Sequence, residues 1–122
     1  MSDASDQLVA QSCTPCRGGV PPLDPEEAES YLAQTPGWSL HDQAHRIEQT
    51  YRFKNFAAAY EFVKRVAALS EAEGHHPDIG FGWGYATISL QTKKIRGLHQ
   101  NDFILAAKIN RLSNEGGSSS SA

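Results

Sequence analysis

Two adjacent histidines, His75 and His76, are the residues of this chain best suited to proton transfer. Histidine ionises near neutral pH without help from its surroundings, so it is the most frequent general acid or base. The pair follows Glu71 and Gly74 and precedes Pro77, which places both rings on a loop that a proline stiffens. The pattern predicts an acid–base site. The alternative is that the two rings only anchor the loop and cap the preceding helix.

A second candidate site is the cysteine pair Cys13 and Cys16, the only cysteines in the chain. A CxxC sequence can form a redox pair or half of a zinc site. No second ligand pair is evident, and the strand-to-helix setting of a thioredoxin motif is missing. Reduced thiols, a metal site completed by distant histidines or another subunit, and a redox pair all stay open. No other metal and no cofactor are predicted.

The composition limits the classes of function. A chain of 122 residues with 39% hydrophobic residues is large enough for one domain with one core. Its formal net charge of -3 argues against a basic nucleic-acid-binding surface. No apolar run approaches the ~20 residues of a membrane span, and the polar start of the chain does not resemble a signal peptide. We therefore expect a cytoplasmic protein that binds neither nucleic acid nor membrane.

The chain divides into three parts by composition. Residues 1–22 are polar and then rich in Gly and Pro, and are expected to form a flexible or surface-draped arm that carries the CxxC. Residues 23–113 form the predicted domain. Residues 114–122 are of low complexity and are expected to be disordered.

The predicted domain alternates helices with antiparallel strands. A helix should begin at Asp24 with a capping box, and a longer one should run from an Asn55 cap to a left-handed stop at Gly74. Strands are expected at 38–40, 46–53 and 83–92, and a last helix at 100–112. This order predicts an α+β fold with helices packed on one face of an antiparallel sheet.

Two sets of large hydrophobic residues receive different predictions. In the long helix, Phe56, Tyr60 and Val63 follow the spacing of a buried stripe and are assigned to the core. In the strand at 83–92, Trp83 and Tyr85 share a face with hydroxyl side chains. That face is either a contact for a ligand or second subunit, or an ordinary half-exposed sheet face.

From Pro22 to Ile109, the chain resembles the pterin-4a-carbinolamine dehydratase family. The resemblance is carried by Pro36-Gly37-Trp38, Glu71-x-x-x-His75-His76-Pro77, Trp83 and Gly97-Leu98-x-x-x-Asp102-Phe103. It implies a four-stranded antiparallel sheet with three helices on one face, assembled into dimers or tetramers. It also implies removal of water from a 4a-hydroxytetrahydropterin, which needs an acid for the leaving hydroxyl and a base for a ring N–H.

The resemblance also implies roles for single residues. His75 would be the leading acid–base group and His76 would hold the pterin. Glu71 and Asp102 would orient the imidazoles, Trp38 would line the pocket, and Trp83 is counted among the substrate-binding residues.

Lys93 departs from the family pattern, in which active dehydratases carry a third histidine at this position. An ordinary lysine has a pKa of about 10.4 and stays charged near neutral pH, so the site looks incomplete. The arm Cys13-x-Pro15-Cys16 in turn resembles pterin-dehydratase-like assembly factors for ribulose-bisphosphate carboxylase/oxygenase (RuBisCO), including those of α-carboxysomes.

These two features lead to a ranked set of functions. The first is an assembly factor that binds RuBisCO subunits without dehydratase activity, for which an association with carboxysomes is a further expectation. The alternative is an active dehydratase that recycles pterin. A transcription coactivator ranks last.

Overall fold

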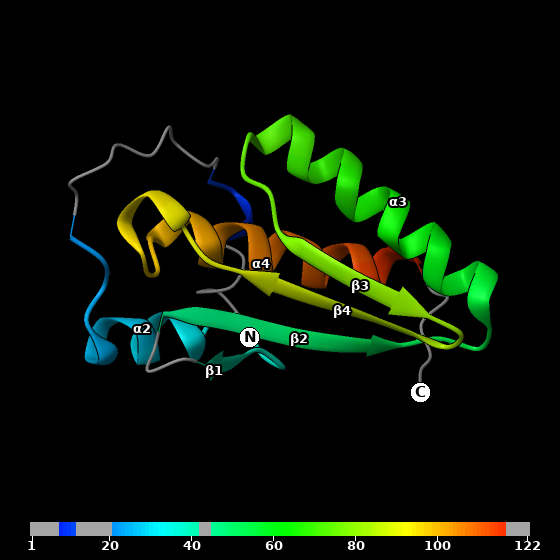
Figure 1. Ribbon diagram of the computed structural model, residues 1–122, viewed down its shortest axis with the longest axis horizontal. Helices are drawn as coiled ribbons and strands as arrows, with labels where there is room; N and C mark the ends of the chain where they lie inside the picture. Colours follow the sequence, from blue (N-terminus) through cyan, green and yellow to red (C-terminus); the bar gives the residue numbers. More distant parts are fainter. Residues whose placement is uncertain (1–7, 12–20, 42–44, 117–122) are drawn as a thin grey trace.

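The computed structural model describes residues 8–11, 21–41 and 45–116. Its centre is a four-stranded antiparallel sheet with strand order β1-β2-β4-β3 (Figure 1). The strands are β1 (Ser39–His41), β2 (Arg46–Arg52), β3 (Asp78–Gly82) and β4 (Tyr85–Leu90). The helices are α2 (Pro25–Leu32), α3 (Phe56–Glu73) and α4 (Gln100–Gly116), and a short 3₁₀ helix, η1 (Lys93–Ile95), follows β4. The predicted α+β fold is confirmed.

Local sequence signals set the helix ends. Asp24 and Glu27 form the predicted capping box at the start of α2. Asn55 caps α3 by accepting from the backbone N–H of Ala58 at 2.8 Å. At its far end Gly74 adopts a left-handed conformation, with φ of 69°. The predicted bounds of the long helix are therefore confirmed.

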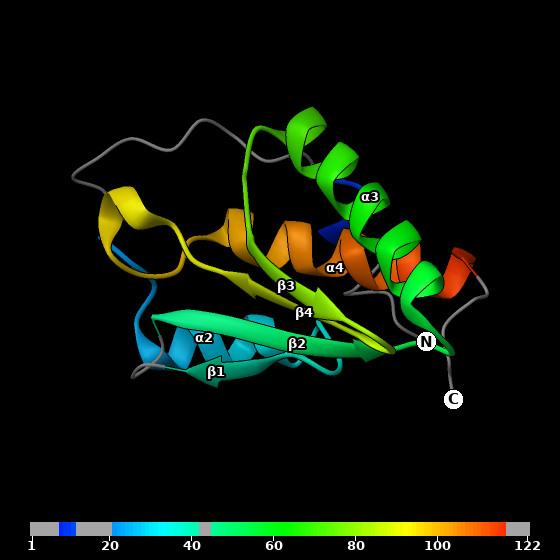
Figure 2. The same cartoon turned by 45° about the vertical axis from the view of Figure 1, so that its right-hand side comes forward.

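Alternation along the strands separates the buried face of the sheet from the open one. On β4, Ala86, Ile88 and Leu90 are fully buried against the helices. On β2, Ile47 and Tyr51 are buried beside them. The helices pack on this face of the sheet (Figure 2). The alternate side chains of β2 and β4 therefore point to the opposite, open face.

The prediction that Phe56 and Tyr60 belong to the core is wrong, because they are 49% and 45% exposed. Their rings lie against Phe81 of β3, with centroids 5.4 and 6.2 Å away. Helix α3 runs along this edge of the sheet (Figure 1). Its innermost aromatic residue is instead Phe62, which is 1% exposed. Val63 is half-buried.

Two predicted boundaries also need correction, and one residue of the expected arm is buried. Residues 83 and 84 form the turn between β3 and β4 rather than the start of a strand, because Gly84 has φ of +83°. Helix α4 continues to Gly116, into the segment expected to be disordered. Near the N-terminus, Leu8 is only 2% exposed and belongs to the core, so this part of the predicted arm packs against the domain.

Cys13 and Cys16 lie outside the described residues, so the predictions for the CxxC stay untested. Within the described residues, no helix is long and apolar enough to cross a membrane.

Candidate active site

Three segments that are distant in the sequence meet at one end of the sheet. The αL turn at Gly74 ends α3, and the backbone N–H of His75 donates to the Ser70 carbonyl at 3.2 Å. This turn carries the histidine pair to the start of β3. Because β3 and β4 are antiparallel, with Asp78 opposite Ser89, the start of β3 lies beside the end of β4. Helix α4 then begins close by and contributes Asp102.

The centre of the site is the pair formed by His75 and Asp102. Nε2 of His75 lies 2.6 Å from Oδ1 of Asp102, and the two side chains are 12% and 0% exposed. Toward an ionised carboxylate, which can only accept hydrogen bonds, Nε2 is the donor in this contact. None of the described residues bonds Nδ1 of His75, which leaves that nitrogen available to accept or donate a proton. The arrangement is that of an imidazole oriented for acid–base work.

Asp102 is itself held by two further donors, both to Oδ2. The Thr92 hydroxyl donates at 2.8 Å and the backbone N–H of His99 donates at 3.0 Å. With the contact to His75, this buried carboxylate therefore accepts three hydrogen bonds. These hydrogen bonds offset the cost of burying the carboxylate and fix its position.

His76 forms a second imidazole–carboxylate pair, in a different environment. Its Nε2 lies 2.7 Å from Oε2 of Glu71, but the two side chains are 59% and 78% exposed. Solvent screens such a contact, so Glu71 orients His76 only weakly. The two adjacent histidines thus offer one enclosed ring and one that solvent reaches.

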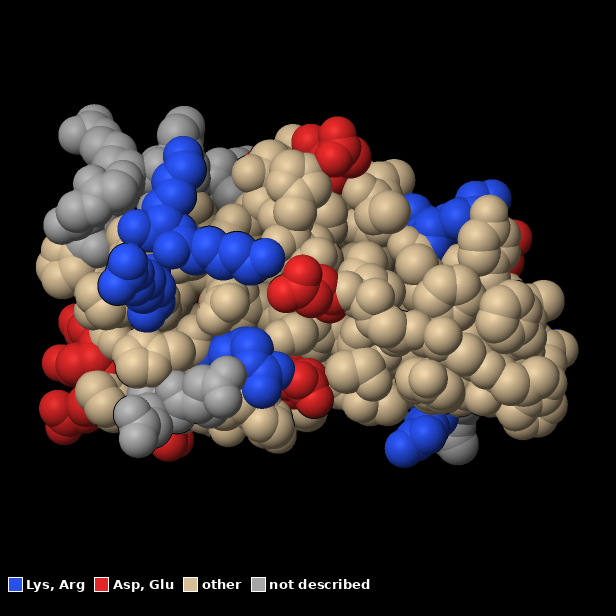
Figure 3. All heavy atoms as spheres, viewed as in Figure 1, with Lys and Arg blue, Asp and Glu red and all other residues tan. Residues whose placement is uncertain are grey.

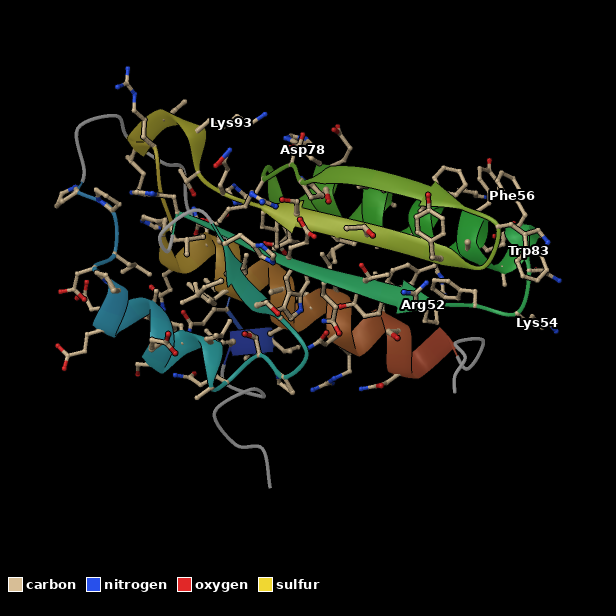
Figure 4. The ribbon with its side chains drawn as sticks, turned by 60° about the horizontal axis from the view of Figure 1, so that its bottom comes forward. Arg52, Lys54, Phe56, Asp78, Trp83 and Lys93 are labelled. Atoms are coloured by element: carbon tan, nitrogen blue, oxygen red, sulfur yellow. The ribbon has the colours of Figure 1, made fainter. Side chains whose placement is uncertain are left out.

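Lys93 lies at the margin of the site. Its Nζ is 3.7 Å from Oδ1 of Asp78, with side chains 70% and 68% exposed (Figure 4). The contact joins η1, which follows β4, to the first residue of β3. Lys93 is therefore a solvated cation next to the histidine loop, and no described residue buries it.

The structure does not bring the two predicted tryptophans to these residues. Trp38 is 5% exposed, and its Nε1 donates to Oδ1 of Asn110 at 3.1 Å. Asn110 comes eight residues after Asp102 in α4, a separation of about 12 Å along the helix. Trp83 is 72% exposed in the β3–β4 turn, at the opposite end of β3 from Asp78, about 16 Å away (Figure 4).

The Trp38 side chain instead joins a polar cluster inside the domain. Oδ1 of Asn110 accepts from Trp38, from Gln49 at 3.0 Å and from the Tyr51 hydroxyl at 2.6 Å. Burial raises the pKa of Tyr51 far above its ordinary value, so that hydroxyl remains a donor. This cluster joins β2 and Trp38, the residue before β1, to α4.

Sequence reasoning missed Thr92 and the backbone of His99. One signal was available: Asp102 is the third residue of α4, where an acidic side chain often accepts from the backbone N–H of the N-cap residue. No such signal was available for Thr92, because its contact with Asp102 depends on how the end of β4 packs against α4. The described residues contain no group of three or more His, Cys, Asp or Glu placed to hold a metal ion.

Comparisons with known proteins show what this chain is similar to. Residues 21–112 match the sequence profile of a family described as pterin 4 alpha carbinolamine dehydratase. A protein of Cupriavidus pinatubonensis, whose name as a pterin-4-alpha-carbinolamine dehydratase is provisional, is 58% identical over 88% of this chain and 93% of its own. An Azoarcus protein with the same provisional name is 55% identical over 93% of this chain and 97% of its own.

Two solved structures are also similar. A transcriptional coactivator/pterin dehydratase from Brucella melitensis superposes with a TM-score of 0.71 at 26% identity, covering 75% of this chain and 97% of that one. A pterin dehydratase-like protein, described as a RuBisCO assembly factor in the alpha-carboxysome, gives a TM-score of 0.55 at 27% identity. It covers 63% of this chain and 89% of that one.

Proposed function

Because this chain belongs to the pterin-4a-carbinolamine dehydratase family, we propose that it removes water from a 4a-hydroxytetrahydropterin. The observation that carries the proposal is the His75–Asp102 pair, an oriented imidazole with one ring nitrogen unoccupied by any described residue. The reaction breaks the C4a–O bond and removes a proton from a ring nitrogen of the substrate. It therefore needs a proton donor to the leaving hydroxyl and a proton acceptor at the ring.

His75 can perform one of these transfers through Nδ1, while Asp102 holds Nε2. His76 stands next to it in the chain and is open to solvent, so it can contact the pterin or exchange protons with water. Glu71 and Asp102 each contact one imidazole. These roles are part of the proposal for this chain.

The lysine at position 93, where active dehydratases carry a histidine, favoured a function without turnover on sequence grounds. Its position in the structure weakens that argument. The lysine is exposed and pairs with Asp78, whereas the His75–Asp102 pair is enclosed and hydrogen-bonded without it. Relatives bearing the dehydratase name reach 58% identity, against 27% for the RuBisCO assembly factor. We therefore place the dehydratase ahead of RuBisCO assembly and carboxysome association, which the comparisons do not support for this chain.

We also propose that the protein forms a dimer or tetramer. The end of the domain at the β3–β4 turn exposes four large aromatic residues: Phe56, Tyr60, Trp83 and Tyr85. Exposed apolar area of this kind favours association. Sedimentation equilibrium of the purified protein tests this, and a monomer at all concentrations would contradict it.

The experiment for the dehydratase follows the loss of freshly generated 4a-hydroxytetrahydropterin by its absorbance, against the uncatalysed rate. We expect clear acceleration by the wild type, and a fall of roughly 10²- to 10⁴-fold for His75→Gln, the usual contribution of a general acid or base. His41→Gln, which changes a histidine of β1, is the matched control and should retain the rate.

The Lys93→His variant tests whether a lysine at position 93 is compatible with turnover. If the exposed lysine is compatible with turnover, this variant should change the rate by only a few-fold. A wild-type rate equal to the uncatalysed rate, together with strong activity in Lys93→His, would show that the chain has lost the activity through this position.

A further inference from the structure

Three cations cluster beside the histidine site: Lys93, Lys94 and Arg96, on the loop that follows β4. All three are exposed, and they form the blue patch over η1 at one end of the molecule (Figure 3). Among the described residues, Asp78 is the only carboxylate that pairs with any of them, and it contacts Lys93 alone. This surplus of positive charge stands out in a chain whose net charge is -3.

The loop that carries these cations is held in place at both ends. Thr92 donates its backbone N–H to the Gly97 carbonyl at 2.8 Å, and its carbonyl accepts from the Gly97 N–H at 3.3 Å. Between them Ile95 is 8% exposed and anchors the turn in the domain. A fixed loop presents its charges without the entropy loss that ordering a mobile segment would cost.

Arg96 occupies a backbone conformation that disfavours an arginine. Its φ is 55°, and it is the one residue other than glycine with positive φ in the part of the chain that the structure describes. Glycine would adopt this left-handed conformation without steric cost. An exposed arginine in this conformation is a local backbone outlier of the kind that points to a functional use.

The same loop is joined directly to the acid–base residues. Thr92, the residue before Lys93, donates its hydroxyl to Asp102, and Lys93 reaches Asp78 next to the histidine loop. The carboxylate of Glu71 is engaged by His76. Lys94 and Arg96 follow Lys93 on this loop, and their positive charges have no partner among the described residues.

We propose that the loop at residues 92–97 binds an anionic group on the side chain of the pterin substrate, either a phosphate ester or a carboxylate. This inference rests on the proposed function, because it names the class of pterin that the same site accepts. The histidines face the ring that reacts, and the cations hold the charged end of the substituent. A pterin with an uncharged side chain remains a substrate but lacks this contact.

Binding of stable pterins tests the inference without turnover. Neopterin and neopterin monophosphate share the ring and side chain and differ in the phosphate, and binding of each is followed by calorimetry. One exposed ion pair changes an equilibrium constant by up to about fivefold, so several predict roughly tenfold tighter binding of the phosphate at low salt. This preference should shrink as salt screens the charges.

A double variant, Lys94→Gln with Arg96→Gly, should reduce the ratio of the two affinities to near one. Glycine at position 96 removes the charge and suits the left-handed turn, so the loop should keep its fold. Lys54→Gln is the matched control, because Lys54 lies at the other end of the molecule from Lys93 (Figure 4). This control should leave the ratio unchanged.

Further probes identify the anion. Folic acid carries carboxylates on its side chain; tighter binding than of neopterin, lost in the double variant, would extend the site to carboxylates. Inorganic phosphate should compete with neopterin monophosphate more strongly than with neopterin.

Each failure has a different meaning. Equal affinities of the wild type for neopterin and its phosphate, or a preference that survives the double variant, overturn the anion site while leaving the dehydratase intact. Preferential binding without any acceleration of dehydration overturns the dehydratase and leaves an anionic pterin-binding protein.

Discussion

Replacing Thr92 by valine tests whether the buried carboxylate of Asp102 controls the site. The substitution exchanges a hydroxyl for a methyl group of similar size, so it removes the 2.8 Å hydrogen bond to Oδ2 without opening a cavity. Asp102 is 0% exposed, so water cannot replace the lost donor unless the structure opens. A buried hydrogen bond to a charged group contributes about 1.5–3 kcal/mol, and we expect the free energy of unfolding to fall by that amount.

A double-mutant cycle separates this contact from general disruption of the loop. In an Asp102→Asn background the acceptor is neutral, so loss of the hydroxyl should cost only about 0.5–1.5 kcal/mol. Urea unfolding of the four proteins gives the coupling energy. Thr92→Ser keeps the hydroxyl and should restore most of the stability.

Activity provides the second measurement for Thr92. The valine variant leaves Nδ1 of His75 in place but loosens the carboxylate that orients the ring, so we expect kcat to fall by about 10- to 100-fold with a smaller change in KM. Thr92→Ser should recover the rate to within a few-fold. If Thr92→Val unfolds like the wild type, or costs the same free energy in the Asp102→Asn background, Asp102 is not the charged centre inferred above.

Two further predictions concern positions outside the histidine pair. Arg96→Gly should raise the free energy of unfolding by about 1 kcal/mol, because glycine relieves the left-handed strain. Urea unfolding measures this difference. A loss of stability would mean that the arginine side chain stabilises the fold by more than its backbone conformation costs. Burial raises the pKa of Tyr51, so above pH ~10 the unfolded chain releases a proton that the folded protein keeps, and stability falls as pH rises. Tyr51→Phe should be the less stable protein at pH 8, since it loses the bond to Asn110, but the difference should shrink by up to about 1.4 kcal/mol per pH unit above 10. A constant difference from pH 8 to 11 would contradict this account.

Much of the fold could be predicted from the sequence because local signals and periodicity agreed. The Asn55 cap and Gly74 stop define α3, and the strands expected at 46–53 and 83–92 contain β2 and β4. The error at Phe56 and Tyr60 has a geometric cause. A stripe at helical spacing identifies a hydrophobic face, but whether the sheet extends far enough to cover it is decided by the width of the sheet.

The site was predictable in its residue types and not in all of its contacts. His75, His76 and Glu71 lie close in the sequence, so their proximity follows from the helix end. Asp102 lies 27 residues after His75 in the chain, and only the resemblance indicated its pairing. Trp38 shows the limit of this reasoning, because its buried contact with Asn110 places it in the core rather than beside His75.

The surroundings of Lys93 in the structure assign it a different role from the one that the sequence suggests. As a replacement for a third imidazole, it would need burial or neighbouring cations strong enough to make an ammonium group release its proton near neutral pH. It is 70% exposed and its Nζ lies 3.7 Å from Oδ1 of Asp78, so its surroundings supply no such burial. Proton transfer is then left to His75, which Asp102 orients inside the domain. Lys93 belongs instead with Lys94 and Arg96, whose exposed positive charge can select a substrate without taking part in the proton transfer.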